Sequence, residues 1–382
     1  MPRLLHLADV GLGARHVELG AAGSAQRERH WQAFEAALDL AAREHCDLVL
    51  IAGNLFASNT QPRGSLERAA RDLGHLVAAG TAVAILPGDS DRDEAGSLYR
   101  TYDLAALGGL PPGTDDLRVL TPWRPALVIP ALDLAVRGYW ASAGQSLDEA
   151  LGAPAEETET GVRLRVGVAR GRVGATEGAT VSARAVGEAG LNYLALGGAP
   201  APAQGQVGST WWADPGPTEL PGDAAGEVGK VLLVTLDPAG SGRVAIETRP
   251  VGRSRRVRLE LPAAGFADRE TLRAHLATLA DGDLACEVHL TGSRPPGLQI
   301  EEAGLEAELG PRFLHLRVLD DTLPPLPEPL PPAESISGAF ARALGERIAA
   351  AHAEGRTADE VELREQLDLG MRILADSTGM PV

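Results

Sequence analysis

The chain has 382 residues, enough for two or three domains and a substantial hydrophobic core. Its 52 acidic residues outnumber its 35 lysines and arginines, and the net charge of -17 disfavours general affinity for nucleic acid. Cys46 and Cys286 are the two cysteines; they are far apart, which excludes a zinc ribbon or a disulfide scaffold and indicates a reducing compartment. No stretch approaches the roughly 20 apolar residues of a membrane helix. We therefore expect a soluble cytoplasmic protein without a membrane partner.

Short apolar runs that end at polar or glycine-containing loops predict buried parallel strands. The predicted strands are Leu4–Asp9, Asp47–Phe56, Ala82–Leu86, Val162–Ala169 and Leu191–Leu196. The ends of the first three present Asp9, Asn54, Asp89 and Asp91. Ligand sites in such sheets gather at the carboxyl ends of the strands, so these side chains are the first candidates for a functional site.

The segments between the first three of these strands have apolar residues at helical spacing. Arg27–His45 and Ser65–Ala79 predict amphipathic helices, which makes consecutive strand–helix–strand units with parallel strands. Val228–Leu236 and Gly242–Pro250 predict an antiparallel pair joined by a turn. This pair would complete a two-sheet sandwich flanked by helices, of the α/β (α+β) class.

The last third of the chain predicts a second unit and a tail. Strands at Arg253–Leu261, Ala285–Leu290 and Arg312–Leu319 with a helix at Asp268–Leu279 predict a compact βαββ unit. A proline-rich segment follows, which favours an extended spacer. Two amphipathic helices then predict a helical tail that is too small to form its own core. The predicted divisions are 1–250, 251–322, a linker at 323–336 and a tail at 337–382.

These motifs resemble the calcineurin-like metallophosphoesterases, specifically the SbcD-type and YhaO-type nuclease subunits of DNA double-strand-break repair. The motif starting His6-Leu-Ala-Asp9 is similar to that family's Asp-x-His-Leu-Gly motif, and Gly53-Asn54-Leu-Phe56 to its Gly-Asp-Leu-Phe motif. Gly88-Asp89-Ser90-Asp91 stands where Gly-Asn-His-Asp belongs, and Gly197-Gly198-Ala199-Pro200 where Gly-His-x-His belongs. The resemblance implies a phosphoesterase domain at 1–250, a DNA-capping domain at 251–322 and an ATPase-docking tail.

In the family these motifs bind two metal ions, usually manganese, that activate water to attack a phosphodiester. Here only Asp9 matches the family's ligand set. The departures are Gly11, Asn54, Asp89, Ser90, Arg170, Gly198 and Pro200. The resemblance implies that four imidazole ligands, the bridging carboxylate and the histidine that would protonate the leaving group are replaced. One of the four imidazoles gives way to Arg170, which places a permanent cation at a cation site. We therefore expect no cofactor and no catalytic residues of the family type.

The resulting interpretation is a catalytically degenerate subunit, a pseudo-nuclease that serves as a scaffold for an SMC-like coiled-coil ATPase in DNA repair or end processing. One alternative is an active metal-dependent phosphodiesterase or exonuclease with one ion bound by Asp9, Asn54 and Asp89, aided by Asp91. Another is an interaction module without a DNA role. A homodimer through Ser65–Ala79 also stays open, although its apolar face equally fits the core.

Two further surfaces are candidates for binding partners. A basic cluster in an otherwise acidic chain predicts DNA contacts, with a solvated strand face as the alternative; its candidate residues are Arg253, Arg255, Arg256 and Arg258. The tail is predicted to expose an apolar face to the ATPase, because the spacer separates it from the domain that could bury it. The residues of that face are Phe340, Leu344, Ile348, Leu367 and Ile373.

Overall fold

The computed structural model describes residues 1–142, 144–153, 161–174, 180–220, 226–237, 244–323, 331–332, 334–354 and 356–378. It divides into two compact units, Met1–Arg256 and Val257–Val382. The predicted turn between Val228–Leu236 and Gly242–Pro250 and the predicted linker at 323–336 lie largely outside the described residues. The sequence predicted four segments, whereas the structure divides into two units, so the predicted boundaries stay predictions.

The first unit contains two six-stranded sheets. The first sheet has, in spatial order, β14 (Val244–Pro250), β13 (Lys230–Leu236), β1 (Arg3–Leu7), β2 (Leu48–Ala52), β3 (Ala82–Leu86) and β4 (Leu117–Val119). The strands β1 to β4 run parallel, while β13 pairs antiparallel with both β1 and β14. The parallel crossovers and the antiparallel edge pair therefore agree with the predicted pattern.

The second sheet has the order β11 (Ala203–Val207), β12 (Thr210–Asp214), β10 (Tyr193–Gly197), β7 (Leu164–Arg170), β6 (Leu134–Tyr139) and β5 (Ala126–Ile129). Its four central strands, β12, β10, β7 and β6, are parallel. A small parallel pair, β8 (Arg172–Val173) and β9 (Thr180–Val181), follows β7.

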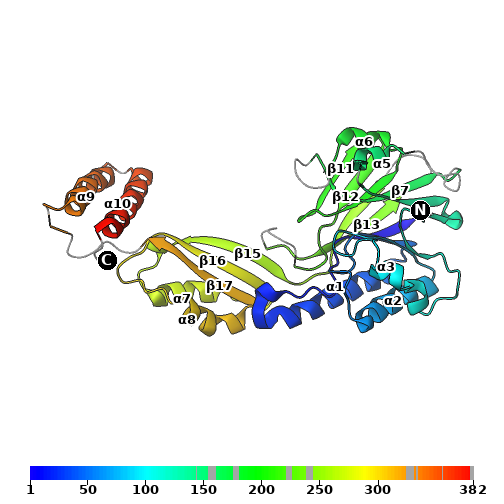
Figure 1. Ribbon diagram of the computed structural model, residues 1–382, viewed down its shortest axis with the longest axis horizontal. Coiled ribbons are helices and arrows are strands. Elements are labelled where there is room, and N and C mark those ends of the chain that lie inside the picture. Colours follow the sequence, from blue (N-terminus) through cyan, green and yellow to red (C-terminus); the bar gives the residue numbers. More distant parts are fainter. Residues whose placement is uncertain are drawn as a thin grey trace. The chain divides into compact units, whose positions relative to one another are not determined.

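Helices cover the outer face of each sheet, and the two sheets pack on one another (Figure 1). The first is covered by α1 (Gly23–Arg43) and α2 (Arg63–Ala78), with the short α3 (Leu98–Thr101) and α4 (Leu104–Leu107); the second by α5 (Leu147–Leu151) and α6 (Ala183–Glu188). The described part of this unit also contains the 3-10 helices η1 (Val17–Ala22) and η2 (Pro130–Leu132). The predicted two-sheet sandwich flanked by helices is confirmed.

Residues alternate along each inner strand between two apolar layers. Leu48 and Leu50 on β2 meet Val166 and Val168 of β7 in the layer between the sheets, whereas Val49 belongs to the layer under α1 and α2. This double burial explains why the strands are continuous apolar runs. The apolar face of α2 is part of this core, so its burial already accounts for the pattern that also suggested a dimer contact.

The second unit contains a three-stranded sheet of β15 (Arg255–Pro262), β16 (Leu284–Ser293) and β17 (His315–Leu323), with β16 and β17 parallel. Its helices are η4 (Ala263–Gly265), α7 (Arg269–Thr278), α8 (Glu302–Leu309) and η5 (Gly310–Arg312). The predicted βαββ order missed α8, so the observed order is βαβαβ. Buried Leu305 and Leu309 join α8 to the core of this unit, which allows a parallel crossover between β16 and β17.

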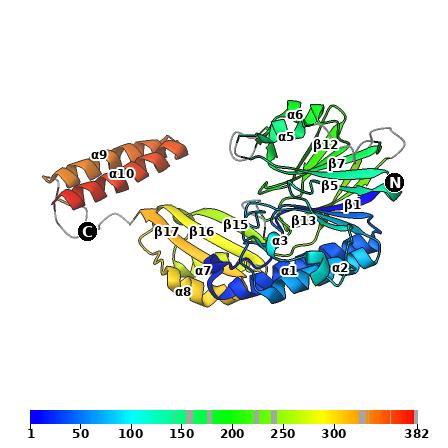
Figure 2. The ribbon, with the colours of Figure 1, turned by 45° about the vertical axis from the view of Figure 1, so that its right-hand side comes forward.

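The tail helices α9 (Ile336–Ala353) and α10 (Thr357–Thr378) lie side by side as a hairpin (Figure 1 and Figure 2). The prediction that their apolar faces are exposed was wrong for most of the named residues. Leu344, Ile348 and Leu367 are buried in a cluster formed by both helices, and Phe340 packs against it. Ile373 remains 59% exposed. The two helices cover each other, so the hairpin has a small core of its own.

Among the described residues, no helix is long and apolar enough to cross a membrane.

Candidate functional site

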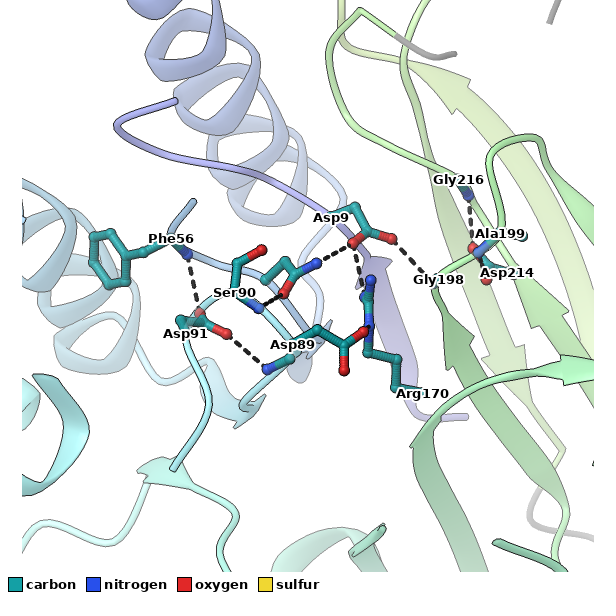
Figure 3. Close-up of polar contacts among 12 residues, drawn as sticks. Asp9, Phe56, Asp89, Ser90, Asp91, Arg170, Gly198, Ala199, Asp214 and Gly216 are labelled. Carbon is teal, nitrogen blue, oxygen red and sulfur yellow. Dashed lines mark hydrogen bonds and ion pairs between the residues drawn. The ribbon is translucent and has the colours of Figure 1, made fainter. Parts of the chain in front are cut away.

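The carboxyl ends of the parallel strands of both sheets meet at one edge of the sandwich. Asp9 follows β1, Asn54 follows β2, and Asp89 follows β3; from the second sheet, Arg170 ends β7 and Gly198 follows β10. The structure brings these five residues together through one set of polar contacts (Figure 3). This is the region in which ligands bind in open parallel sheets.

Asp9 is the centre of this network, and three donors satisfy its carboxylate. Its Oδ1 atom accepts from Asn54 Nδ2 at 2.7 Å and from an Arg170 terminal nitrogen at 2.7 Å. Its Oδ2 atom accepts from the backbone amide of Gly198 at 3.0 Å. Asp9 has a φ of 47° and Asn54 a φ of 51°, which places both in the left-handed region that Asp and Asn tolerate better than other side chains.

Asn54 must be an amide in this arrangement. Its Nδ2 atom donates to Asp9, while its Oδ1 atom accepts from the Ser90 backbone amide at 2.9 Å. A carboxylate at this position would place two negative oxygens at hydrogen-bond distance from each other. An amide side chain at position 54 is therefore matched to the local hydrogen bonding.

Arg170 binds two carboxylates. Its Nε atom donates to Asp89 Oδ2 at 2.6 Å, and Asp89 also lies 3.5 Å from Arg92. Burial by itself would lower the pKa of Arg170, but Asp9 and Asp89 outweigh this effect and raise its pKa above the ordinary value. The side chains of Arg170 and Asp9 are 20% and 16% exposed, whereas Asp89 is 68% exposed. The cationic group is thus largely enclosed.

The other predicted site positions contribute no ligand-bearing side chain to this network. Gly11 donates its backbone amide to the Asn54 carbonyl at 2.9 Å and has a φ of 65°. Ser90 contributes its backbone amide, and Pro200 is exposed. Gly198 likewise contributes only its amide to Asp9.

Asp91, also a predicted site position, makes structural contacts with the loops around it. It is fully buried and accepts from Phe56 N at 3.0 Å, Gly88 N at 2.7 Å and the Tyr99 hydroxyl at 2.7 Å. Burial raises its pKa, and these three donors oppose that rise. Figure 3 shows the carboxylate turned towards Phe56. Its oxygens fix the loop after β3, so Asp91 would not bind a single ion together with Asp9.

Sequence reasoning missed Asp214, the last residue of β12, which lies beside the site (Figure 3). It is 2% exposed and accepts from the amides of Ala199 at 2.9 Å and Gly216 at 2.8 Å. Burial raises the pKa of Asp214 to about 7 against the opposing effect of these two donors. The signal in the sequence was an acidic residue directly before Pro215-Gly216, at the end of another strand of the second sheet.

The raised pKa of Asp214 predicts a pH dependence of stability. Between about pH 4 and pH 7 the folded state binds a proton that the unfolded state has released, so the free energy of unfolding falls as the pH rises, by up to about 4 kcal/mol. Asp214→Asn removes this titration. As the pH rises from 5 to 8, we expect the free energy of unfolding of wild type to fall by about 2 to 4 kcal/mol relative to that of the variant.

Urea unfolding at several pH values measures this difference. All five tryptophans precede residue 213, so their fluorescence reports on the first unit. His6 is a separate titrating group: it is fully buried, its Nδ1 atom lies 2.8 Å from the Tyr193 hydroxyl, and burial lowers its pKa to about 3. It affects wild type and variant alike and cancels in the comparison. Parallel stability curves for the two proteins would contradict the assignment of the raised pKa to Asp214.

The residues present do not fit the two-metal centre that the family resemblance implies. Within the described residues, no three His, Cys, Asp or Glu side chains are grouped so that they could hold a metal ion. The oxygens of Asp9 already accept from three donors, and Arg170 lies between Asp9 and Asp89. A divalent cation beside this guanidinium would be repelled by it.

Of the basic cluster, Arg253, Arg255 and Arg256 belong to the first unit and Arg258 belongs to the second. Arg256 lies 3.6 Å from Glu18, and Arg258 lies 3.9 Å from Glu287. Arg253 is exposed and Arg255 half-buried. On β15, Val257, Leu259 and Leu261 pack against the core, so strand alternation places Arg256 and Arg258 on the opposite face. DNA contact by these four arginines stays a prediction.

The first unit has two helix-covered six-stranded sheets with a polar cluster at the carboxyl ends of their parallel strands, which agrees with the predicted sandwich of the metallophosphoesterase type. No model of a known protein family matches the chain. Over 98 residues, 25% of this chain, it is 36% identical to the DNA double-strand break repair protein Mre11 of Aeropyrum pernix. Over 89 residues, 23% of this chain, it is 30% identical to the protein of the same name from Sulfurisphaera tokodaii.

These matches confirm the predicted resemblance to the metallophosphoesterase nuclease family of double-strand-break repair. They cover 23% and 22% of the two relatives, so the chain spans less than a quarter of the length of each. Among solved structures, the protein TT1561 of Thermus thermophilus is similar with a TM-score of 0.43 and 14% sequence identity, over 65% of this chain and 99% of that one.

Proposed function

We propose that the chain is an Mre11-like subunit of DNA double-strand-break repair or DNA-end processing in which the phosphoesterase sandwich is a scaffold rather than a nuclease. The similarity to the two Mre11 proteins supports the DNA-repair assignment. The observation that carries the scaffold role is the ion pairing of Arg170 with Asp9 and Asp89. A fixed cation lies where this family's chemistry needs ligands with lone pairs.

The tail hairpin is proposed to bind an SMC-like coiled-coil ATPase. It has its own small core, and it exposes Leu369 and Ile373, four residues apart on α10, together with Ile336 at the start of α9. Residues at this spacing form one stripe on a helix, which is how helices present apolar side chains to a partner groove.

We expect purified protein to cleave neither single-stranded nor double-stranded DNA in the presence of manganese. Loss of one residue that merely supports a metal ligand costs about 10- to 100-fold in metal affinity or activity. Here several direct ligands are replaced. A nuclease assay with a known manganese-dependent nuclease as positive control, together with metal analysis of the purified protein, tests this. Cleavage that Asp9→Ala abolishes, or two bound manganese ions, would establish the rival function of an active phosphodiesterase.

The single substitution Asn54→Asp is expected not to restore activity. It returns the family's carboxylate but leaves Arg170 in place and removes the hydrogen bond to Asp9. In the variant, Ser90 would still stand where the family has a histidine. A serine cannot protonate the leaving group as that imidazole does. The same nuclease assay measures the outcome, with wild-type protein purified in parallel. Manganese-dependent turnover by the variant would show that one carboxylate is enough to complete a metal site, against this proposal.

A further inference from the structure

The contacts of Arg170 cross from one sheet to the other. Arg170 ends β7 in the second sheet, while both of its carboxylate partners lie in loops of the first sheet, after β1 and β3. The two ion pairs are short, at 2.7 Å to Asp9 and 2.6 Å to Asp89. One guanidinium therefore connects the end of β7 to the loops after β1 and β3, which are distant from it in the sequence.

Two glycines, Gly53 and Gly198, lie against the side chain of Arg170. A Cβ added to Gly53, which has a φ of 91°, would lie 3.0 Å from an Arg170 terminal nitrogen. A Cβ on Gly198 would lie 3.4 Å from Arg170 Cγ. Two glycines thus leave room on both sides for an arginine side chain to pass between the loops.

The charges in this network are balanced. Arg170 and Arg92 supply two positive charges, and Asp9 and Asp89 supply two negative ones. The neutral amide of Asn54 donates to the same Asp9 oxygen as Arg170 does. A carboxylate at position 54 would leave the cluster with an excess negative charge, so Asn54 and Arg170 are complementary replacements.

We propose that Arg170 is a built-in structural cation that holds the loops after β1, β3 and β7 together and closes this edge of the sandwich without a divalent metal ion. The inference goes beyond the proposed function, because it concerns the stability of the first unit and holds for any partner of the chain. Removing one member of an enclosed ion pair leaves the other charge without compensation, which is strongly destabilising.

The test is thermal unfolding followed by tryptophan fluorescence. Arg170→Met keeps most of the side-chain length and removes the charge; we expect its Tm to fall by about 5 to 15 °C. The matched control is Arg184→Met, which breaks the exposed pair of Arg184 with Glu188 on α6 and should shift the Tm by less than about 2 °C. A Tm for Arg170→Met as close to wild type as that of the control would overturn the proposal.

Manganese chloride and EDTA provide a second measurement on the wild-type protein. We expect neither to change the Tm, because the built-in cation leaves no need for an added one. A rise of several degrees with manganese would contradict the proposal, since a metal ion would then complete the site. If Arg170→Met does not fold, Arg170→Lys is the deciding variant. Because it keeps the positive charge, we expect it to fold with a Tm below that of wild type. A Lys variant that is as unfolded as the Met variant would refute the role of charge.

These outcomes are separate from those of the proposed function. Nuclease activity would refute the scaffold role even if Arg170→Met is destabilised. An unchanged Tm for Arg170→Met would refute the structural cation even if no DNA is cleaved.

Discussion

A chain that ends at Pro332 is expected to lose binding to the proposed SMC-like coiled-coil ATPase, whereas the chain of 382 residues retains it. The reason is the exposed apolar stripe of the hairpin, in which Leu369 is 52% and Ile373 is 59% exposed. Burial of these side chains with Ile336 would contribute about 3 to 6 kcal/mol before the costs of association. We expect at least a tenfold loss of affinity, measured by co-purification and by titration of the purified components.

Point substitutions separate the surface of the hairpin from its internal packing. Leu369→Asp and Ile373→Asp should weaken binding while leaving the helical content of the chain unchanged in circular dichroism. Leu344→Asp should instead disrupt the hairpin, because Leu344 is buried between the two helices. Ala343→Asp adds the same charge at an exposed position of α9 and is the matched control. Equal binding by the truncated chain and the 382-residue chain would show that the tail is not the docking element.

The tail also shows a limit of sequence reasoning. Periodicity correctly placed Leu344, Ile348 and Leu367 on apolar faces, but it could not tell what covers those faces. The two helices cover each other, and Phe340 of α9 packs directly against Gly370 of α10. An apolar stripe predicts burial, whereas its partner depends on contacts between distant residues. The small residue at position 370 was a local sign of close helix packing.

The sandwich was more predictable, because its strands are continuous apolar runs buried on both faces. Helix α8 was missed because its apolar residues Leu305 and Leu309 are few and stand among alanines and acidic residues. At the site, the positions at strand ends could be predicted from the motifs. The ion pair between Asp9 and Arg170 could not, since it joins residues 161 positions apart whose side-chain directions depend on the packing of two sheets.

The replacement of Gly197 by alanine is expected to destabilise the first unit strongly. Gly197 ends β10, and a Cβ added there would lie 1.9 Å from the carbonyl oxygen of Ala52 at the end of β2. Both atoms belong to rigid strands of opposing sheets, so no flexible side chain can move aside. Overpacking of a well-packed interior costs about 1 to 3 kcal/mol and occasionally more, and we expect the upper end of this range for Gly197→Ala.

The effect should also reach the candidate site, because the next residue, Gly198, donates its amide to Asp9. Gly64→Ala is the matched control: it makes the same chemical change in α2, where a Cβ would meet nothing within 4 Å. Alanine in a helix is favoured over glycine, so the control should be unchanged or more stable by up to about 1 kcal/mol. Urea unfolding followed by tryptophan fluorescence compares the three proteins. If Gly197→Ala were as stable as Gly64→Ala, the close approach of β10 to β2 would be wrong, and with it the geometry that brings Arg170 to Asp9.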